Sequence, residues 1–290
     1  MLLTNLIRFV SYLALLSLLI GCATTVPTLK LKDSVIDDAV VWSGEVLVEG
    51  VVTVKKTGQL TIEPGTHVYF VPKDADGDGI GDAELLVEGT LIAHGTAAAP
   101  IVFTSAAKQP KPSDWKYLYL DFARKAELDY VISEYAYSGL QIHFCRARVT
   151  NSIFRHNVDG LRFSTVNLLA AGNSIYNNRH GLRYEERNGE AFVHHNEIRD
   201  NDIGLFVVTR SEDKTRIEQN NITGSRQYNV KLGWQQPGAV TLPHNWWGTK
   251  DQAIINETFL DKKVDARLGL VTAPEPLAGP VQTSAWQQPE

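Results

Sequence analysis

Residues 173–182 read NSIYNNRHGL, and residues 196–205 read NEIRDNDIGL. Both follow the pattern N-x-I-x-x-N-x-x-G-L, and the two copies begin 23 residues apart. Residues 151–161, NSIFRHNVDGL, follow it with one residue more, and residues 220–230, NNITGSRQYNV, form a looser copy with Asn229 in place of the glycine. Self-similarity at a fixed period of this length is the signature of a solenoid, in which each repeat packs on its neighbours.

The spacing of the repeats indicates which kind of solenoid to expect. With Gly139-Leu140 counted as a further copy, the glycine positions fall at 139, 160, 181, 204 and 229, so the steps are 21, 21, 23 and 25 residues. Short β-rich runs fill these steps and leave no room for the helical crossover of a βαβ unit. The L-x-x-L-x-L frame of leucine-rich repeats is also missing. We therefore expect an all-β fold, a coil of parallel strands that rises about 4.8 Å with each turn.

Equivalent residues of such a coil stack into columns. Leu161, Leu182 and Leu205 are expected to point inward and form the core, and Asn178 and Asn201 are expected at the turns. Asparagine suits a turn because it tolerates left-handed backbone and because its side chain can bond the main chain of the neighbouring turn. The repeated asparagines are therefore interpreted as structural.

The first half of the chain carries the same solenoid in a different form, since Leu-Val-Glu-Gly at 47–50 recurs at 86–89. A resemblance to the right-handed parallel β-helix repeat proteins of the pectate-lyase-like superfamily rests on four segments: LTIEPGT at 60–66, GTLIAHGT at 89–96, PIVFTS at 100–105 and NWWG at 245–248. It covers roughly residues 40 to 270 and is specific for fold but not for activity. At about 22 residues per turn, residues 41–249 then form a right-handed parallel β-helix of about nine turns.

A parallel coil leaves unpaired backbone at its ends, and such edges need a cover. The segment from Asp251 to Leu268 contains Ile254, Ile255 and the pair Phe259 and Leu260, which suit a short helix or loop that covers the final turn. We expect residues 250–290 to be a C-terminal cap followed by a loose tail, which begins near Pro274.

The amino terminus carries an apolar run from Phe9 to Ile20, preceded by Arg8. Twelve residues suit the apolar region of an export signal better than a membrane span, which needs about 20. The run ends in Leu-Ile-Gly-Cys22, which resembles the lipobox of bacterial lipoproteins. The resemblance implies a signal peptide at 1–21, a diacylglycerol on the Cys22 thiol and, because Ala23 follows, anchoring in the outer membrane of the cell envelope. Residues 22–40 are expected to be the tether and lead-in to the coil.

The composition limits the classes of partner. The 28 Lys+Arg and 33 Asp+Glu residues give a formal net charge of −5, which argues against a nucleic-acid binder with a broad basic face. The two cysteines, Cys22 and Cys145, exclude a disulfide framework and a cysteine-rich zinc module. Cys145 is expected to be a small buried apolar residue.

Residues 74–82, DADGDGIGD, form the sharpest local motif. Alternate aspartates in a glycine-rich loop place carboxylate oxygens around one point, as calcium requires. The expected ligands are Asp74, Asp76, Asp78, the carbonyl of Ile80 and Asp82. The loop departs from an EF-hand because leucine stands at its twelfth position, so we expect modest affinity and a structural calcium ion. The alternative is that the aspartates only keep an exposed loop solvated.

A second candidate site is a row of outward side chains next to the inward leucines. If the leucines of the Gly-Leu pairs point inward, the residues that follow them point outward. The row contains Gln141, Arg162, Arg183 and Lys231, with Phe206 between the last two. Stacked cations of this kind suit the carboxylates or sulfates of an extended acidic polysaccharide. The alternative is an ordinary solvated surface.

No catalytic set is recognised. The resemblance implies that lyases of the superfamily use calcium-bound aspartates beside an arginine or lysine, and that its hydrolases carry Gly-His-Gly and Arg-Ile-Lys. Here Arg179-His-Gly181 only half matches, and paired outward carboxylates for glycoside hydrolysis are not found. His156, His180, His194 and His195 are interpreted as turn and surface residues rather than metal ligands.

Three functional hypotheses remain from the sequence. The first is a lipid-anchored β-helix that binds envelope glycans or a partner protein without turnover. The second is a calcium-assisted polysaccharide lyase or hydrolase that uses Arg162 or Arg183. The third is an accessory factor in the maturation of a metal enzyme, since β-helix repeats also occur in such proteins.

Overall fold

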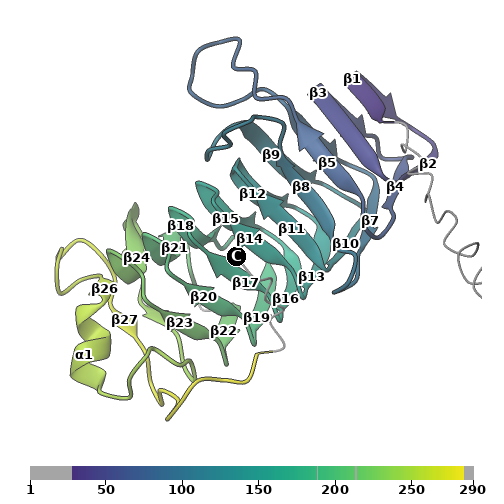
Figure 1. Ribbon diagram of the computed structural model, residues 1–290. Coiled ribbons are helices and arrows are strands. Elements are labelled where there is room, and N and C mark those ends of the chain that lie inside the picture. The colour runs from purple at the N-terminus through teal and green to yellow at the C-terminus, as the bar shows by residue number, and fades with distance from the viewer. Residues whose placement is uncertain (1–27, 188, 213, 284–290) are drawn as a thin grey trace, which may run out of the picture.

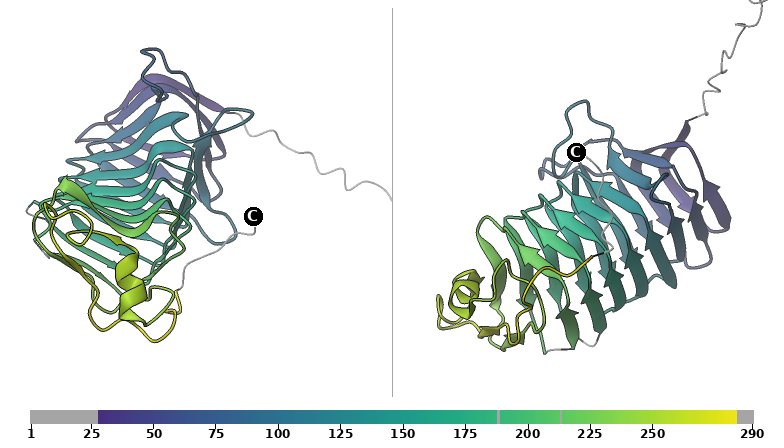
Figure 2. Two further views of the ribbon diagram at one scale, coloured as in Figure 1. Left: turned by 90° about the vertical axis from the view of Figure 1, so that its left-hand side faces the viewer. Right: turned by 60° about the horizontal axis from the view of Figure 1, so that its bottom comes forward.

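Short strands and tight corners alternate along the chain and wind into an elongated coil (Figure 1). The computed structural model describes residues 28–283 apart from Asn188 and Asp213. Figure 2 shows the strands stacked along the axis of the coil, with a small cap at the end opposite to β1. No helix in the described part of the chain has the length and apolar character that a membrane span requires.

Each turn of the coil contributes one strand to each of three faces. Face 1 is a parallel sheet of eight strands: β2 (Ala39–Trp42), β4 (Gln59–Ile62), β7 (Thr90–His94), β10 (Lys125–Asp129), β13 (Arg146–Thr150), β16 (Asn167–Ala171), β19 (Glu190–His194) and β22 (Thr215–Glu218). Face 2 follows the first half of β3 (Glu45–Val54) with β5 (His67–Phe70), β8 (Ile101–Ser105), β11 (Val131–Glu134), β14 (Ile153–Arg155), β17 (Ser174–Tyr176), β20 (Glu197–Arg199) and β23 (Asn221–Thr223).

Face 3 carries the longer strands of the later turns. It begins with the second half of β3. The strands stacked after it are β6 (Glu84–Val87), β9 (Trp115–Asp121), β12 (Ala136–His143), β15 (Asp159–Ser164), β18 (His180–Glu185), β21 (Ile203–Thr209), β24 (Tyr228–Gln235) and β26 (Phe259–Leu260). β1 (Leu29–Ile36) pairs along the whole of β3. β25 (Val240–Thr241) and β27 (Val271–Thr272) form a separate pair. The prediction of a parallel β-helix solenoid is confirmed.

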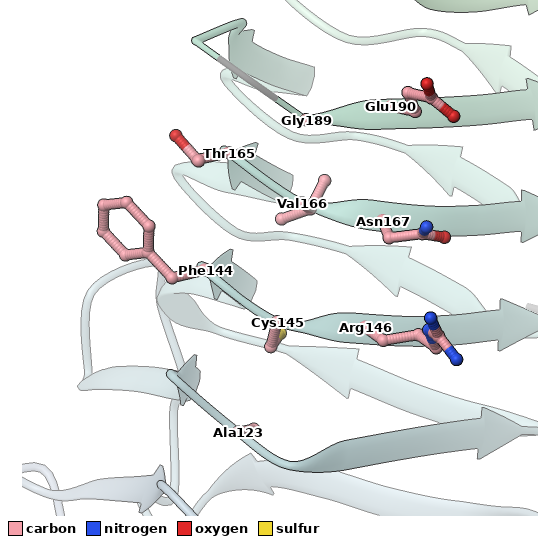
Figure 3. Close-up of a pocket in the computed structure, with 9 residues that line it drawn as sticks. All are labelled: Ala123, Phe144, Cys145, Arg146, Thr165, Val166, Asn167, Gly189 and Glu190. Atoms are coloured by element: carbon pink, nitrogen blue, oxygen red, sulfur yellow. The ribbon is translucent and has the colours of Figure 1, made fainter.

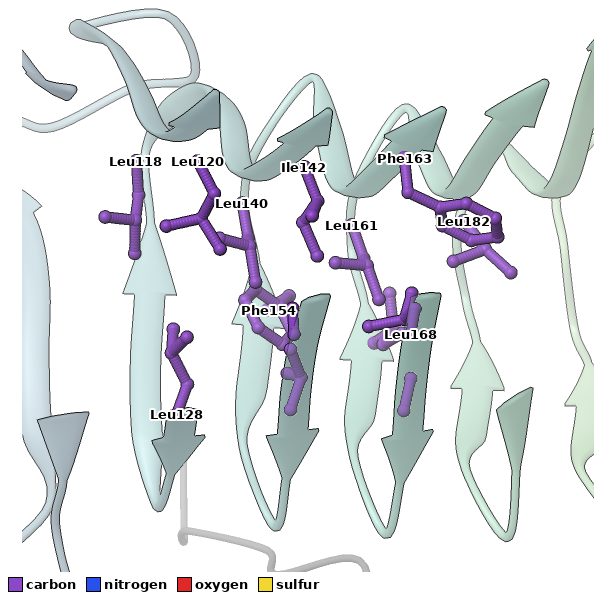
Figure 4. Packing of buried hydrophobic residues seen from close by; sticks show 14 of the residues in the cluster. Leu118, Leu120, Leu128, Leu140, Ile142, Phe154, Leu161, Phe163, Leu168 and Leu182 are labelled. Carbon is purple, nitrogen blue, oxygen red and sulfur yellow. The ribbon is translucent and has the colours of Figure 1, made fainter. Parts of the chain in front are cut away.

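The predicted leucine column has the expected register. Leu140, Leu161, Leu182, Leu205 and Val230 are consecutive Cα partners on face 3. All five side chains are fully buried. Figure 4 shows the first three of them in line inside the coil. Inward positions alternate with outward ones along each strand, so the core is a continuous apolar column inside the three faces.

One repeat is aligned differently from the sequence prediction. Ser152, and not Asn151, is the equivalent of Asn173, because the Ser152 N–H donates to the Asn173 Oδ1 at 3.0 Å. Phe154 then pairs with Ile175. This turn therefore has no additional residue, and Asn151 is the corner residue before it, with a φ of 48°.

Two columns of buried asparagines bind successive turns together. At the corner between faces 2 and 3, the Asn157 N–H donates to the Asn178 Oδ1, and the Asn178 N–H donates to the Asn201 Oδ1, each at 2.9 Å. A second column at the corner between faces 1 and 2 contains Asn173, Asn196, Asn220 and Asn245. The predicted bond from the asparagine side chain to the neighbouring main chain is confirmed.

The predicted left-handed backbone of these asparagines is wrong. The positive φ belongs to the residue before each column asparagine, such as Asn177 (55°) and Asp200 (54°). The column asparagines are needed for their amide groups, and the preceding residue makes the bend. The repeated glycine has a related cause: a Cβ on Gly160 would lie 2.9 Å from the Asn178 Nδ2 and 2.8 Å from the Gly181 carbonyl oxygen.

The coil begins earlier than the predicted boundary, and its other end carries the short helix that was expected there. Residues 29–36 are already a strand of the coil, so the lead-in predicted for 22–40 is shorter. At the other end α1 (Gln252–Glu257) begins after Asp251, whose carboxylate accepts the N–H groups of Ala253 and Ile254. Ile255 and Phe259 are buried under this predicted cap, whereas Ile254 is 52% exposed.

The segment after the cap is held against the coil rather than loose as far as residue 283. The Leu277 N–H donates to the Asn245 carbonyl oxygen at 3.1 Å. The Val281 N–H and carbonyl group both bond the Asn221 side chain, at 2.8 and 3.0 Å. The segment therefore runs back along the corner between faces 1 and 2. Residues 284–290 lie outside the described part.

Candidate functional site

The predicted outward row lies on face 3. Gln141, Arg162, Arg183, Phe206 and Lys231 are consecutive Cα partners on β12, β15, β18, β21 and β24. The structure therefore brings all four predicted residues into one row, in which neighbours are one strand spacing, about 4.8 Å, apart. Gln141 is buried at the start of the row.

A buried carboxylate orients the two arginines. Asp159 is fully buried, and its Oδ2 lies 3.0 Å from the Arg183 Nη1 and 3.9 Å from the Arg162 Nη1. Its Oδ1 lies 2.7 Å from the His180 Nδ1. A buried charge is stable only when it is paired in this way. Asp159 and His180 are therefore parts of the support beneath the row, although the sequence analysis interpreted His180 as a turn or surface residue.

Aromatic and cationic side chains alternate at the later end of the row. The Arg183 guanidinium lies 5.5 Å and the Lys231 ammonium 5.6 Å from the centroid of the Phe206 ring. The His180 ring stacks on the same phenyl ring at 4.9 Å. Cations at these distances are attracted to the face of the ring, so Phe206 holds both cations in the row.

The earlier end of face 3 carries a tyrosine and histidine cluster that the sequence analysis missed. The Tyr119 hydroxyl lies 3.1 Å from the His143 Nδ1, and Tyr117 packs edge-on against both Tyr119 and Tyr137. Burial raises the pKa of Tyr119 to about 12, and Asp121 contributes in the same direction. Burial lowers the pKa of His143, and the Arg162 guanidinium lowers it further. The repeat alignment stops at Gly139, so β9 was never aligned with the row.

The aspartate loop projects from the corner between β5 and β6. One oxygen of each of Asp74, Asp76 and Asp78 lies within 4.8 Å of the others. Asp82 is not part of this group, and its Oδ2 accepts the Ala75 N–H at 2.9 Å, which closes the loop. Three of the predicted ligands are thus brought together, and the fourth aspartate holds the loop in shape.

Backbone N–H groups shape the same loop from inside. The Asp74 carboxylate accepts the N–H groups of Gly77 at 2.7 Å and Gly79 at 3.0 Å. Desolvation acts to raise the pKa of Asp74, but these hydrogen bonds hold it below its ordinary value. Exposed, ionised carboxylates at this separation are the donor set that calcium prefers, so the residues present fit this ion.

The two cysteines have different outcomes. Cys145 is buried, as expected, and burial raises the pKa of its thiol to about 12. Cys22, the predicted lipidation site, lies outside the described residues.

Comparison with known families agrees with the geometry. Residues 115–241 match a family model described as a right-handed beta-helix region, and residues 34–126 match one described as a pectate-lyase-like beta-helix domain. No curated protein and no solved structure matched the chain. The two matched segments overlap and lie on consecutive turns of one coil of parallel strands, and the fold is therefore a right-handed parallel β-helix of the kind that both models describe.

Proposed function

We propose that face 3 binds an extended acidic glycan without turnover, on a protein anchored in the bacterial outer membrane by a lipid on Cys22. The observation that supports this most is the row of Gln141, Arg162, Arg183 and Lys231 on successive turns. A rigid row of donors with one residue per turn suits a polymer whose charged groups also repeat.

The surroundings of the row favour a sugar ligand. Phe206 lies within the row, and Tyr117, Tyr119 and Tyr137 cluster beside its start. Aromatic rings combine an apolar face with, in tyrosine, a polar edge, which suits the apolar and hydroxyl-bearing sides of a sugar. Asp159 pre-orients the two guanidinium groups, so little side-chain freedom is lost on binding.

The aspartate loop is proposed to hold a structural calcium ion. Asp74, Asp76 and Asp78 supply the carboxylate oxygens, and the ion would offset their mutual repulsion. The loop connects β5 of face 2 to β6 of face 3. An ion that orders the loop would therefore also stabilise face 3 at its N-terminal end.

The binding proposal is tested by titrating the purified protein with a panel of uronate polymers and with neutral polymers of matched length. The Arg162→Gln/Arg183→Gln variant is expected to lose about tenfold or more in affinity, because two charge-assisted contacts are removed. Lys56→Gln/Lys108→Gln removes two exposed cations elsewhere and serves as the matched control. Equal affinity in both variants would contradict the proposal.

A second candidate function, β-elimination on a uronate polymer, is favoured by the hydrogen bond between Tyr119 and His143. Neutral His143 would take the proton from the carbon next to the sugar carboxylate, and Tyr119 would protonate the leaving glycosidic oxygen as the carbon–oxygen bond breaks. Arg162 would neutralise the carboxylate. The proton then returns from His143 to Tyr119 along their hydrogen bond, which restores both groups.

Incubating the protein with the same uronate polymers distinguishes binding without turnover from β-elimination. Turnover would appear as unsaturated product that absorbs in the ultraviolet, and it would be lost in Tyr119→Phe. Burial holds the pKa of His143 below its ordinary value, so this base stays neutral to mildly acidic pH. Turnover would persist over the same range and decline at lower pH, where His143 becomes protonated. Binding with no unsaturated product at any pH supports the non-catalytic proposal.

A further inference from the structure

An apolar cluster lies on the outside of face 2 and is called here the outer cluster. It consists of Val102, Ile132, Ile153 and Tyr176, which pack on one another apart from the core of the coil. Their side chains point outward, because residues alternate along a strand and neighbours such as Phe154 belong to the core. Although the cluster faces outward, Ile132 is 2% exposed and Ile153 is 0% exposed.

Another outward apolar pair shows how much exposure such side chains keep without a cover. Phe122 and Phe144 stack with their ring centroids 4.6 Å apart at the corner between faces 3 and 1. Figure 3 shows the Phe144 ring projecting from the coil beside a hollow of about 670 Å³. The two rings remain 58% and 43% exposed. Contact between successive turns therefore does not bury an outward apolar side chain, and the outer cluster needs a further segment over it.

The C-terminal segment enters the column of outer positions to which the cluster belongs. This column follows the axis of the coil through consecutive Cα partners: Asn221, Glu197, Ser174, Ile153, Ile132 and Val102. Val281 bonds the Asn221 side chain through both its N–H and its carbonyl group. The chain arrives there from Asn245, one turn later in the coil, where Leu277 is bonded. It therefore runs along the column toward the outer cluster.

Gln282 places the described end of this segment beside the turns that carry the cluster. It lines a hollow of about 420 Å³ together with Asn151 and Gly172. These two are corner residues, and they lie two positions before Ile153 and Ser174. The segment therefore meets these turns at the corner where their face 2 strands begin.

The opposite side of the outer cluster is closed by polar groups that already have partners. The Tyr176 hydroxyl accepts from the Arg155 Nη1 at 3.3 Å, and the Arg155 Nε lies 2.8 Å from the Glu134 Oε2. The Arg199 guanidinium lies 4.5 Å from the centroid of the Tyr176 ring. The cluster is therefore open toward the corner where the C-terminal segment arrives, and it suits an apolar side chain.

The residues that follow have the length and the chemistry to cover the cluster. Residues 284–290 read SAWQQPE, and Trp286 lies five positions after Val281. An extended chain of that length spans about 17 Å. Ile153 is three strand spacings from Asn221, about 14 Å, so it lies within reach. A tryptophan side chain buries about 150–250 Å² of surface, enough to cover several aliphatic side chains.

We infer that residues 284–290 dock on the outer cluster of face 2, with Trp286 packed on Ile153 and Ile132. The C-terminal segment is then a strap that follows the corner between faces 1 and 2 and ends over the apolar side chains it shields. It keeps this part of face 2 from contact with water and with other molecules. The inference does not depend on the functions proposed for face 3.

Cysteine labelling of the full chain tests this docking. In a Cys22→Ser/Cys145→Ser background, Ile153→Cys reports on the outer cluster, and Val41→Cys, at a position that is 59% exposed on β2, is the control. A maleimide should label Ile153→Cys slowly. Adding Trp286→Ala should raise that rate about tenfold or more, because the cysteine then no longer waits for the segment to open. Val41→Cys should react rapidly with and without Trp286→Ala.

Further variants separate docking from a general loss of structure. Gln288→Ala, in the same segment, should leave the labelling of Ile153→Cys slow, and Trp286→Phe should keep most of the protection. Ser174→Cys, a change of one atom at a buried outer position, repeats the comparison if Ile153→Cys weakens the coil. Thermal melting establishes that each variant is folded.

Two results would overturn the inference. One is an equal labelling rate for Ile153→Cys and Ser174→Cys with and without Trp286→Ala. The other is protection that rises with protein concentration and does not depend on Trp286, which would assign the outer cluster to contact with a second copy of the chain.

Discussion

The later turns, from β12 to β24, and the earlier turns, from β2 to β9, keep the same three faces by different means. In the later turns, buried asparagine side chains bond the main chain of the preceding turn at two corners. In the earlier turns, glycines allow close approach of successive turns: the Gly89 N–H donates to the Val54 carbonyl oxygen at 3.2 Å, and the Thr90 N–H donates to the Gly58 carbonyl oxygen at 3.1 Å. A coil can therefore be specified by side chains that repeat in the sequence or by backbone contacts that do not.

The largest effect is expected from breaking the asparagine column. The Asn196 Oδ1 accepts the N–H and the side-chain amide of Asn173, each at 2.9 Å, and its own amide donates to the Ala170 carbonyl oxygen. Asn196→Ala leaves several buried groups without partners, and each such group costs about 1–3 kcal/mol, so the free energy of unfolding should fall by about 4 kcal/mol. Urea unfolding measures it.

The matched control is Asn167→Ala, an exposed asparagine on β16. Its effect should stay within about 0.5 kcal/mol, as for most surface substitutions. A cost for Asn196→Ala no larger than this would show that the column does not hold the later turns together.

A smaller effect is expected from the glycine corners of the earlier turns. A Cβ on Gly89 would lie 2.2 Å from the Lys55 carbonyl oxygen and 2.3 Å from the Gly58 carbonyl oxygen. Gly89→Ala forces the backbone of two turns apart and should cost about 2 kcal/mol in urea unfolding. Gly279→Ala, where a Cβ would meet no atom within 4 Å, should be neutral. Equal stability of the two variants would contradict this account of the corners.

The smallest effect is expected from the aspartate loop, which belongs to the earlier turns. Calcium should raise the melting temperature by about 3 °C through preferential binding to the folded state. Asp76→Ala/Asp78→Ala should abolish the rise, because it removes two of the three clustered carboxylates. The exposed pair Asp37→Ala/Asp38→Ala should keep it. Melting that is unaffected by calcium or by a chelator would remove the proposed ion.

The two regions also differ in how far the sequence predicts them. The period of the later turns was enough to place Leu161 beside Leu182 and Arg162 beside Arg183, because equal steps imply equal positions in a coil. The predicted register of the repeat at 151–161 was wrong by one residue at its start. Ser152 occupies the position that asparagine has in the later repeats, and the adjacent Asn151 was aligned with that asparagine instead.

Features that depend on contacts between turns were not predictable from the pattern. Asp159 is fully buried although it is charged, because arginine and histidine side chains of its own and the next turn surround it. The hydrogen bond between Tyr119 and His143 joins a strand before the repeats to one inside them.

The register of successive turns is the central claim, and disulfide formation between neighbouring outer positions tests it most directly. In a Cys145→Ser background, Arg148→Cys/Leu169→Cys places two cysteines on directly paired positions of β13 and β16, within the Cα separation of up to about 7 Å that a disulfide allows. Arg148→Cys/Phe192→Cys places them two turns apart, at about 10 Å. Mild oxidation followed by mass spectrometry should show an intramolecular bond in the first variant and none in the second. A bond in neither variant, or in both equally, would contradict the coil.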